Sequence, residues 1–136
     1  MLDRYFCSFA GETFPNRFYQ HAARTDRDHN SNTISTLPSI WDQLSPIPNT
    51  QGVPTGAYFF RDLPYLALWG TKYFPFWHPF AQGDTDSLGI PVTTQPFLDM
   101  VAQGKLPNVS YIDPTFGGEN IEIGRASCRE RVSYHV

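Results

Sequence analysis

Hydrophobic residues occur in short runs that glycines and prolines interrupt, a pattern that predicts short elements. Residues 56–60, Gly-Ala-Tyr-Phe-Phe, form the clearest predicted strand because an aromatic run lies between a glycine and a charged pair. A second strand is predicted over residues 109–114, with Asp113 at its carboxyl end. Residues 2–11 lead into a glycine turn, and their apolar run suits a strand as well as a short helix.

Three other segments carry helical patterns. Residues 16–23 and 63–73 place apolar side chains at helical spacing, and we expect the second helix to be buried. A third helix is predicted over 95–104, with Thr93 or Thr94 as its cap and a glycine at its end.

A short helix is also predicted over residues 39–44, capped by Ser35 or Thr36, with Pro38 just inside it. Residues 74–80, Phe-Pro-Phe-Trp-His-Pro-Phe, contain too many prolines for a regular element. Helix followed by strand, twice over, predicts a layered α/β fold.

In layered α/β folds, sites gather at the carboxyl edge of the sheet. Asp113 is therefore a candidate for a residue near a site, with an ordinary Asp-Pro turn as the alternative.

With 136 residues and 40% hydrophobic residues, the chain is long enough for one domain with a core. A formal net charge of -3 gives no basic footprint for nucleic acid, so none is expected as a partner. No run approaches the ~18 apolar residues of a membrane span, and no signal peptide is recognisable. The cysteines, Cys7 and Cys128, form neither a disulfide framework nor a metal pattern.

Two segments have both a functional and a structural interpretation. Residues 24–36 crowd aspartate, asparagine and histidine together and could bind a cation, but they lack a calcium-loop pattern, so we favour a solvated loop. The rings of residues 74–80 either line an apolar cleft or cover the core, and we favour the second. His78 among them is expected to be packed rather than catalytic.

The segment Gly11-Glu12-Thr13-Phe14-Pro15-Asn16-Arg17 contains the candidate chemistry. Gly11 permits close backbone approach, and Pro15 biases Phe14 away from helical geometry, so Thr13 would be presented on a constrained turn. The alternative is an ordinary helix start, with Pro15 in the first turn and Thr13 or Asn16 as the cap.

Residues 122–136 differ abruptly in character from the rest of the chain. Residues 122–132, Glu-Ile-Gly-Arg-Ala-Ser-Cys-Arg-Glu-Arg-Val, resemble a translated sequencing adapter. We therefore expect a partial domain over 1–121 and a non-native, disordered tail over 122–136.

Separated motifs in residues 2–120 together resemble the bacterial phosphoesterase family. They are Arg4-Tyr5-Phe6-Cys7-Ser8, Gly11, Thr13-Phe14-Pro15-Asn16-Arg17, Ser39-Ile40-Trp41-Asp42, Asp62-Leu63-Pro64 and Tyr111-Ile112-Asp113-Pro114-Thr115-Phe116-Gly117-Gly118-Glu119-Asn120. That family includes phospholipases C and an acid phosphatase and belongs to the alkaline phosphatase superfamily. The resemblance implies an incomplete α/β/α sandwich.

The same resemblance implies roles for three residues. Thr13 would be a nucleophile that forms a phosphothreonine intermediate, with a divalent metal ion as the cofactor that activates its hydroxyl. Asn16 would be catalytic by donating to a nonbridging phosphoryl oxygen. Arg17 would bind substrate through a forked donor, or else brace the turn by pairing with an acidic neighbour.

Two metal-binding motifs of the family are not found in this sequence. These are a Glu-Asn pair ahead of the Thr13 turn and an Asp-Asp-His segment after residue 120, so we expect an inactive fragment that binds no metal. The expected substrate is a phospholipid or another phosphoester, with an acid phosphatase as the alternative to a phospholipase C. A noncatalytic lipid-binding module built on residues 74–80 is the alternative of another class. The phospholipase C branch implies a periplasmic or secreted parent.

Overall fold

The computed structural model describes residues 7–86 and 88–113. Within these residues, the α-helices are α1 (Thr13–Ala22) and α2 (Pro96–Ala102), and the strands are β1 (Gly56–Phe60), β2 (Trp77–Pro79) and β3 (Val109–Ile112). The same residues also form the short 3-10 helices η1 (Ile40–Asp42), η2 (Tyr65–Trp69) and η3 (Phe74–Phe76). The predicted tail over 122–136 and most of the predicted element over 2–11 lie outside the described residues.

The strands form one parallel sheet in the order β2-β1-β3. In the register, Tyr58 of β1 lies between Trp77 of β2 and Tyr111 of β3. All five residues of the central strand β1 are buried, which is why its sequence is a continuous apolar run without alternation. The α/β class predicted from the sequence is confirmed.

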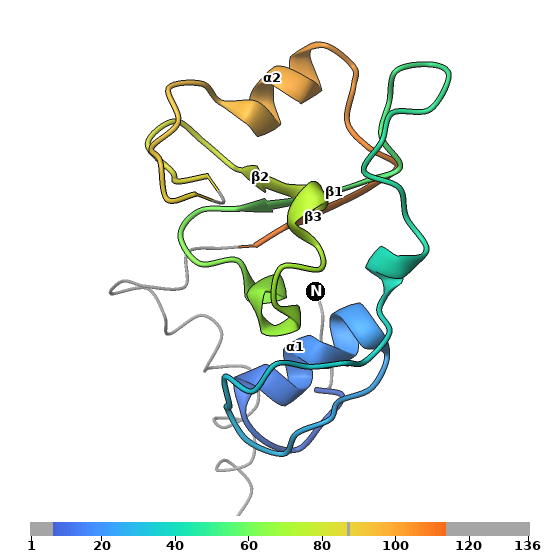
Figure 1. Cartoon of the computed structure of the whole chain (residues 1–136), viewed down its shortest axis with the longest axis vertical. Coiled ribbons are helices and arrows are strands. Elements are labelled where there is room, and N and C mark those ends of the chain that lie inside the picture. Colours follow the sequence, from blue (N-terminus) through green and yellow to red (C-terminus); the bar gives the residue numbers. More distant parts are fainter. Residues whose placement is uncertain (1–6, 87, 114–136) are drawn as a thin grey trace, which may run out of the picture.

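The two α-helices lie on opposite sides of this sheet (Figure 1). Successive side chains of β1 point to opposite faces, so each face has its own partners. On one face Phe59 meets Phe97 of α2 edge to face at 5.1 Å. On the other face Tyr58 contacts His21 of α1 and Trp41 of η1. A helix, sheet and helix layering results.

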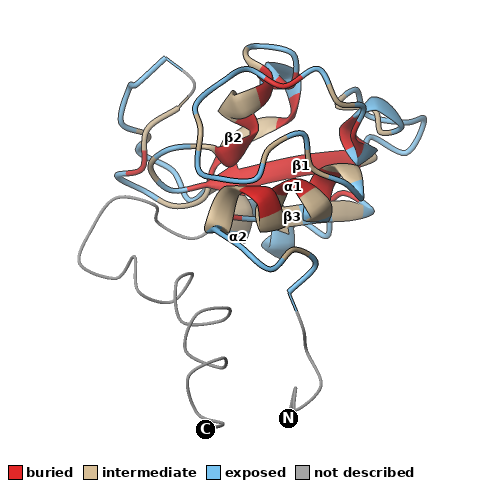
Figure 2. Ribbon diagram, turned by 90° about the horizontal axis from the view of Figure 1, so that it is seen from below, coloured by how far each residue is buried: buried red, intermediate tan, exposed pale blue. Residues whose placement is uncertain are grey.

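Aromatic rings make up most of the core, and burial is concentrated around β1 and the elements that face α1 (Figure 2). The buried cluster consists of Phe18, Trp41, Tyr58, Phe60, Tyr65, Leu66, Trp69, Tyr73 and Phe76. Phe18 and Leu66 have no exposed surface. Since a domain of this size buries limited area, large rings supply much of the apolar surface that stabilises it.

The prediction of a helix over residues 63–73 is wrong in its length and type, because only Tyr65–Trp69 is helical and it has 3-10 geometry. Pro64 precedes this turn in an extended conformation, which delays the start. Gly70 ends it with a φ of 65°, a left-handed value that favours glycine. The predicted burial is confirmed for Tyr65, Leu66 and Trp69.

The helix predicted over 39–44 is also shorter, a single 3-10 turn at Ile40–Asp42. Its cap is Ser39 rather than Ser35 or Thr36. The Ser39 side chain accepts from the backbone N–H of Trp41, and the backbone N–H of Ser39 donates to the Asp42 carboxylate at 2.9 Å. The capping box therefore determines this start.

Residues 74–80 were predicted to be irregular, but they form η3 followed by strand β2. Pro79 is tolerated because β2 is an edge strand of the described sheet. Two of the rings cover the core, as favoured from the sequence: Phe76 is buried, and Trp77 packs edge to face on Phe60, whereas Phe74 is exposed.

The third predicted helix is confirmed as α2, whereas its predicted caps are only partly correct. Its N-cap is Gln95, without a side-chain cap, rather than Thr93 or Thr94. Gly104 follows with a φ of 63°, as expected for a helix end. The strand predicted over 109–114 is confirmed as β3, and Asp113 directly follows it.

Candidate functional site at the amino end of helix α1

Thr13 is the first residue of α1, so the helix begins three residues earlier than the sequence predicted. Neither Thr13 nor Asn16 is the cap, because Glu12 occupies that position without a side-chain cap bond. The loop supplies the cap instead: Asn30 accepts from the backbone N–H of Phe14 at 2.8 Å. The Glu12 carboxylate in turn accepts from the backbone N–H of Asn30.

Asn16 holds the turn that precedes the helix. Its Nδ2 donates to the carbonyl oxygens of Phe9 at 2.8 Å and of Glu12 at 3.0 Å, and its Oδ1 accepts from Phe9 N at 2.9 Å. Both amide hydrogens therefore have backbone partners. In this conformation Asn16 braces the turn, and donation to a phosphoryl oxygen would require one of these bonds to break.

Arg17 pairs with Asp113, the residue that follows β3. The Arg17 side chain has a relative exposure of 12% and the Asp113 side chain of 0%. The guanidinium also lies 4.1 Å from the centre of the Tyr65 ring. Of the two roles predicted for Arg17, this geometry matches the bracing of the turn by an acidic neighbour.

Contacts between α1 and β3 show how the helix is oriented. Arg17 contacts Asp113 at the carboxyl end of the strand, whereas Gln20 accepts a hydrogen bond from the Tyr111 hydroxyl. The helix thus runs antiparallel to β3, and its amino end lies at the carboxyl edge of the sheet (Figure 1). Thr13, one turn before Arg17, lies on the same helix face and farther toward that edge.

Asp113 also accepts from the Tyr58 hydroxyl and from the backbone N–H of Tyr65, the latter at 3.2 Å. Burial raises the pKa of Tyr58 well above its ordinary value, and the Asp113 carboxylate adds to the increase. Tyr58 therefore keeps its proton and remains a donor. The sequence pointed to Asp113 but gave no signal for Tyr58 or Tyr65, because neither lies near Thr13 or Asp113 along the chain.

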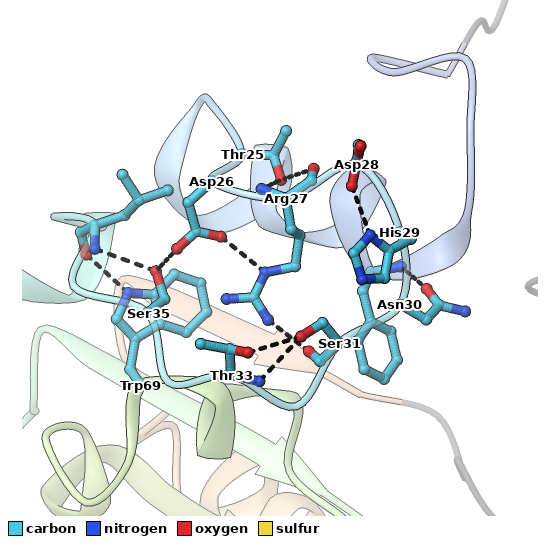
Figure 3. A network of polar contacts seen from close by, with 12 residues as sticks. Thr25, Asp26, Arg27, Asp28, His29, Asn30, Ser31, Thr33, Ser35 and Trp69 are labelled. Atoms are coloured by element: carbon cyan, nitrogen blue, oxygen red, sulfur yellow. Dashed lines mark hydrogen bonds and ion pairs between the residues drawn. The ribbon is translucent and has the colours of Figure 1, made fainter.

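The polar loop predicted over residues 24–36 carries no helix or strand, and polar contacts connect several of its side chains (Figure 3). Arg27 donates to the Asp26 carboxylate at 2.7 Å and to the carbonyl oxygen of Ser31 at 2.6 Å. The His29 ring contacts the Asp28 carboxylate at 2.6 Å. Within residues 7–86 and 88–113, no group of three or more His, Cys, Asp or Glu residues is placed to hold a metal ion.

His78 lies on β2 as a packed residue. Its ring centre lies 5.6 Å from that of Phe59, and burial lowers its pKa below the ordinary value. The structure thus places it beside the core rather than beside Thr13. Among the described helices, none combines the length and apolar character that a bilayer crossing needs.

The geometry defines an α/β protein whose hydroxyl-bearing helix start lies at the carboxyl edge of a parallel sheet. A model of the Phosphoesterase family matches residues 1–124, so the chain belongs to that family and is, at family level, a phosphoester hydrolase. Searches for similar curated proteins and for similar solved structures give no match. The family suspected from the sequence is confirmed.

Proposed function

We propose that Thr13 is the nucleophile of a phospholipase C-like phosphodiesterase. The observation that carries the proposal is the position of Thr13: it begins α1, and α1 is held at the carboxyl edge of the sheet by the Arg17–Asp113 pair. In layered α/β folds this edge is where ligands bind. The positive end of a helix dipole also favours a phosphoryl group there.

The proposed chemistry proceeds in two steps. The Thr13 Oγ1 forms a bond to phosphorus while the bond from phosphorus to the leaving oxygen breaks, and the alcohol departs with the proton. Water then attacks phosphorus, the bond from phosphorus to Oγ1 breaks, and a proton from the water restores the threonine hydroxyl as the phosphomonoester product leaves. Asn16 is proposed to donate to a nonbridging oxygen when its bond to the Phe9 carbonyl opens.

We propose metal dependence from the family resemblance, and the described residues do not supply a matching ligand set. The carboxylate next to Thr13 is that of Glu12, and it accepts a hydrogen bond from the Asn30 backbone. The Asp113 carboxylate is paired with Arg17 and Tyr58. None of the described residues is therefore proposed as a metal ligand.

The substrate is proposed to be a phosphodiester, with a phosphomonoester as the alternative that the same nucleophile would serve. A noncatalytic lipid-binding module on residues 74–80 gains no support from their packing. Trp77 lies against Phe60, and Phe80 stacks on Phe97 at 5.0 Å. Trp77 is thus packed against the buried cluster, and Phe80 is packed against α2.

Covalent capture of the intermediate tests this proposal. The 136-residue chain is incubated with p-nitrophenyl phosphorylcholine or with p-nitrophenyl phosphate, with and without Zn²⁺, then quenched in acid and analysed by peptide mass spectrometry. We expect one slow transfer per chain, without turnover, onto the peptide that contains Thr13: a phosphorylcholine adduct from the diester or a phosphoryl adduct from the monoester. The adduct should be absent from Thr13→Ala and retained in Thr13→Ser. Thr36→Ala, which changes an exposed threonine elsewhere, is the matched control.

The two substrates separate the diester proposal from the monoester alternative. An adduct from p-nitrophenyl phosphorylcholine favours the diesterase, and an adduct from p-nitrophenyl phosphate alone favours the monoesterase. An adduct on another residue, or none in any condition, contradicts Thr13 as the nucleophile of this chain. Robust turnover that Thr13→Ala abolishes would support the nucleophile but contradict the expectation that the chain is inactive.

A further inference from the structure

The carboxylate of Asp113 connects three elements that are distant in the sequence. One oxygen pairs with Arg17 of α1, which is 96 residues away, and the other accepts from Tyr58 of β1 and from the backbone of Tyr65 in η2. The backbone N–H of Asp113 donates to Phe59 O at 2.7 Å. With no exposed surface, the carboxylate sits where charge must be matched by close partners.

The first turn of α1 is fixed through the same group. The Arg17 guanidinium lies against the Tyr65 ring, and the Tyr65 hydroxyl donates to the carbonyl oxygen of Phe14 at 2.6 Å. The Phe14 and Tyr65 rings meet edge to face at 5.5 Å. Thr13 therefore lies next to a residue held by Tyr65 and one turn from a residue held by Asp113.

We propose that Asp113 is a positioning residue for the phosphoryl-transfer site, and this inference rests on the proposed function of Thr13. Asp113 acts through Arg17: the buried pair fixes the rotation of α1 and its depth at the sheet edge, and so the place of the Thr13 hydroxyl. Asp113 itself does not touch the phosphoester. Replacing it with a neutral residue removes the negative charge that pairs with Arg17 at the sheet edge and lets the first turn move.

Phosphate binding tests the inference with a matched control. The 15N-labelled 136-residue chain is titrated with inorganic phosphate, with and without Zn²⁺, while the amide signals of Thr13 and Asn16 are followed by NMR. Asp113→Asn removes the charge that holds Arg17. Tyr58→Phe removes a hydrogen bond to the other carboxylate oxygen but keeps the Arg17–Asp113 pair. Urea unfolding of each variant records its stability.

We expect saturable shifts in the wild type, a loss of phosphate affinity of about tenfold to a hundredfold in Asp113→Asn, and little change in Tyr58→Phe. Arg17→Lys, which keeps the charge but loses the fork, should bind with intermediate affinity. If a folded Asp113→Asn variant binds phosphate with wild-type affinity, the inference about Asp113 is overturned, but the proposed function of Thr13 is not. Equal losses of affinity in Asp113→Asn and Tyr58→Phe, in proportion to lost stability, would also overturn it, because the role would then be structural. Absence of shifts in the wild type would overturn the proposed function, and the inference with it.

Discussion

Asn16 and Phe9 are joined by two hydrogen bonds that run in opposite directions. Asn16 Nδ2 donates to Phe9 O at 2.8 Å, and Phe9 N donates to Asn16 Oδ1 at 2.9 Å. The Asn16 side chain thus bonds both the backbone N–H and the backbone C=O of Phe9, as a paired strand would do. The turn before Thr13 is fixed by this pairing rather than by regular secondary structure.

Replacing Asn16 should therefore destabilise the turn. Asn16→Ala removes all three hydrogen bonds of the amide, and we expect the free energy of unfolding to fall by about 1–3 kcal/mol. Asn16→Asp keeps the acceptor for Phe9 N but loses both donors, so its loss should be at least as large. Urea unfolding measures these changes. Asn108→Ala, at an exposed position, is the control, and a similar loss there would argue against the bracing role.

The Arg17–Asp113 pair should be strongly coupled because it is buried. We expect Arg17→Met and Asp113→Asn each to lower the free energy of unfolding by about 3–5 kcal/mol, since each removes the opposite charge from a buried ion pair. The double variant should lose less than the sum of the two. A double-mutant cycle by urea unfolding checks this.

An exposed ion pair supplies the comparison for that cycle. Lys72 contacts Asp42 at 2.7 Å, and the Lys72 side chain is half exposed. Lys72→Met should therefore change the free energy of unfolding by no more than about 1 kcal/mol. Strict additivity for Arg17 and Asp113 would contradict the assignment of a coupled pair.

His21 should make the protein sensitive to acid. The side chain is buried among aromatic rings, and its Nδ1 accepts from the Trp41 indole at 3.2 Å. Its Nε2 has no hydrogen-bond partner within the described part of the chain. Burial, and secondly the charge of Arg17, lowers the pKa of His21 from 6.5 to about 3. The folded state therefore binds fewer protons than the unfolded state between these values. The stability contribution is complete above pH 6.5 and decreases as the pH falls toward 3.

Thermal or urea unfolding between pH 7 and pH 5 measures this effect. In that range the free energy of unfolding should fall by up to about 1.4 kcal/mol per pH unit from this group. His21→Gln, which stays neutral and can accept from Trp41, should flatten the dependence. His29→Gln, which removes an exposed histidine elsewhere, is the control. An unaltered slope in His21→Gln would show that other groups cause the acid sensitivity.

Two neighbouring residues of α2 should differ in their effect on stability. Phe97 contacts Phe59 at 5.1 Å and Phe80 at 5.0 Å, whereas the Leu98 side chain is 52% exposed. We expect Phe97→Ala to lower the free energy of unfolding by about 2–4 kcal/mol because it removes a ring that packs on Phe59, on the face of the sheet that α2 covers. Leu98→Ala should change it by less than about 1 kcal/mol. Equal effects would mean that α2 does not anchor through Phe97.

The elements that the sequence predicted correctly are those with a local cause. The continuous apolar run of β1 is required by burial on both faces, and α2 ends where Gly104 allows a left-handed conformation. The helix over residues 63–73 and the irregular segment over 74–80 were wrong for a related reason. Aromatic content alone does not distinguish a 3-10 turn or an edge strand from a longer helix, because the neighbouring elements decide.

For the candidate site too, local features could be predicted from the sequence, whereas long-range contacts could not. The sequence by itself determined that a hydroxyl residue stands between Gly11 and Pro15, because these residues restrict the backbone locally, and that the chain belongs to a phosphoesterase family. Only the tertiary structure decided that Asn16 braces the turn and that Arg17 pairs with Asp113. Arg17 and Asp113 are 96 residues apart, so their pairing leaves no local pattern in the sequence. The pair forms only when α1 packs antiparallel to β3 and excludes water from the contact.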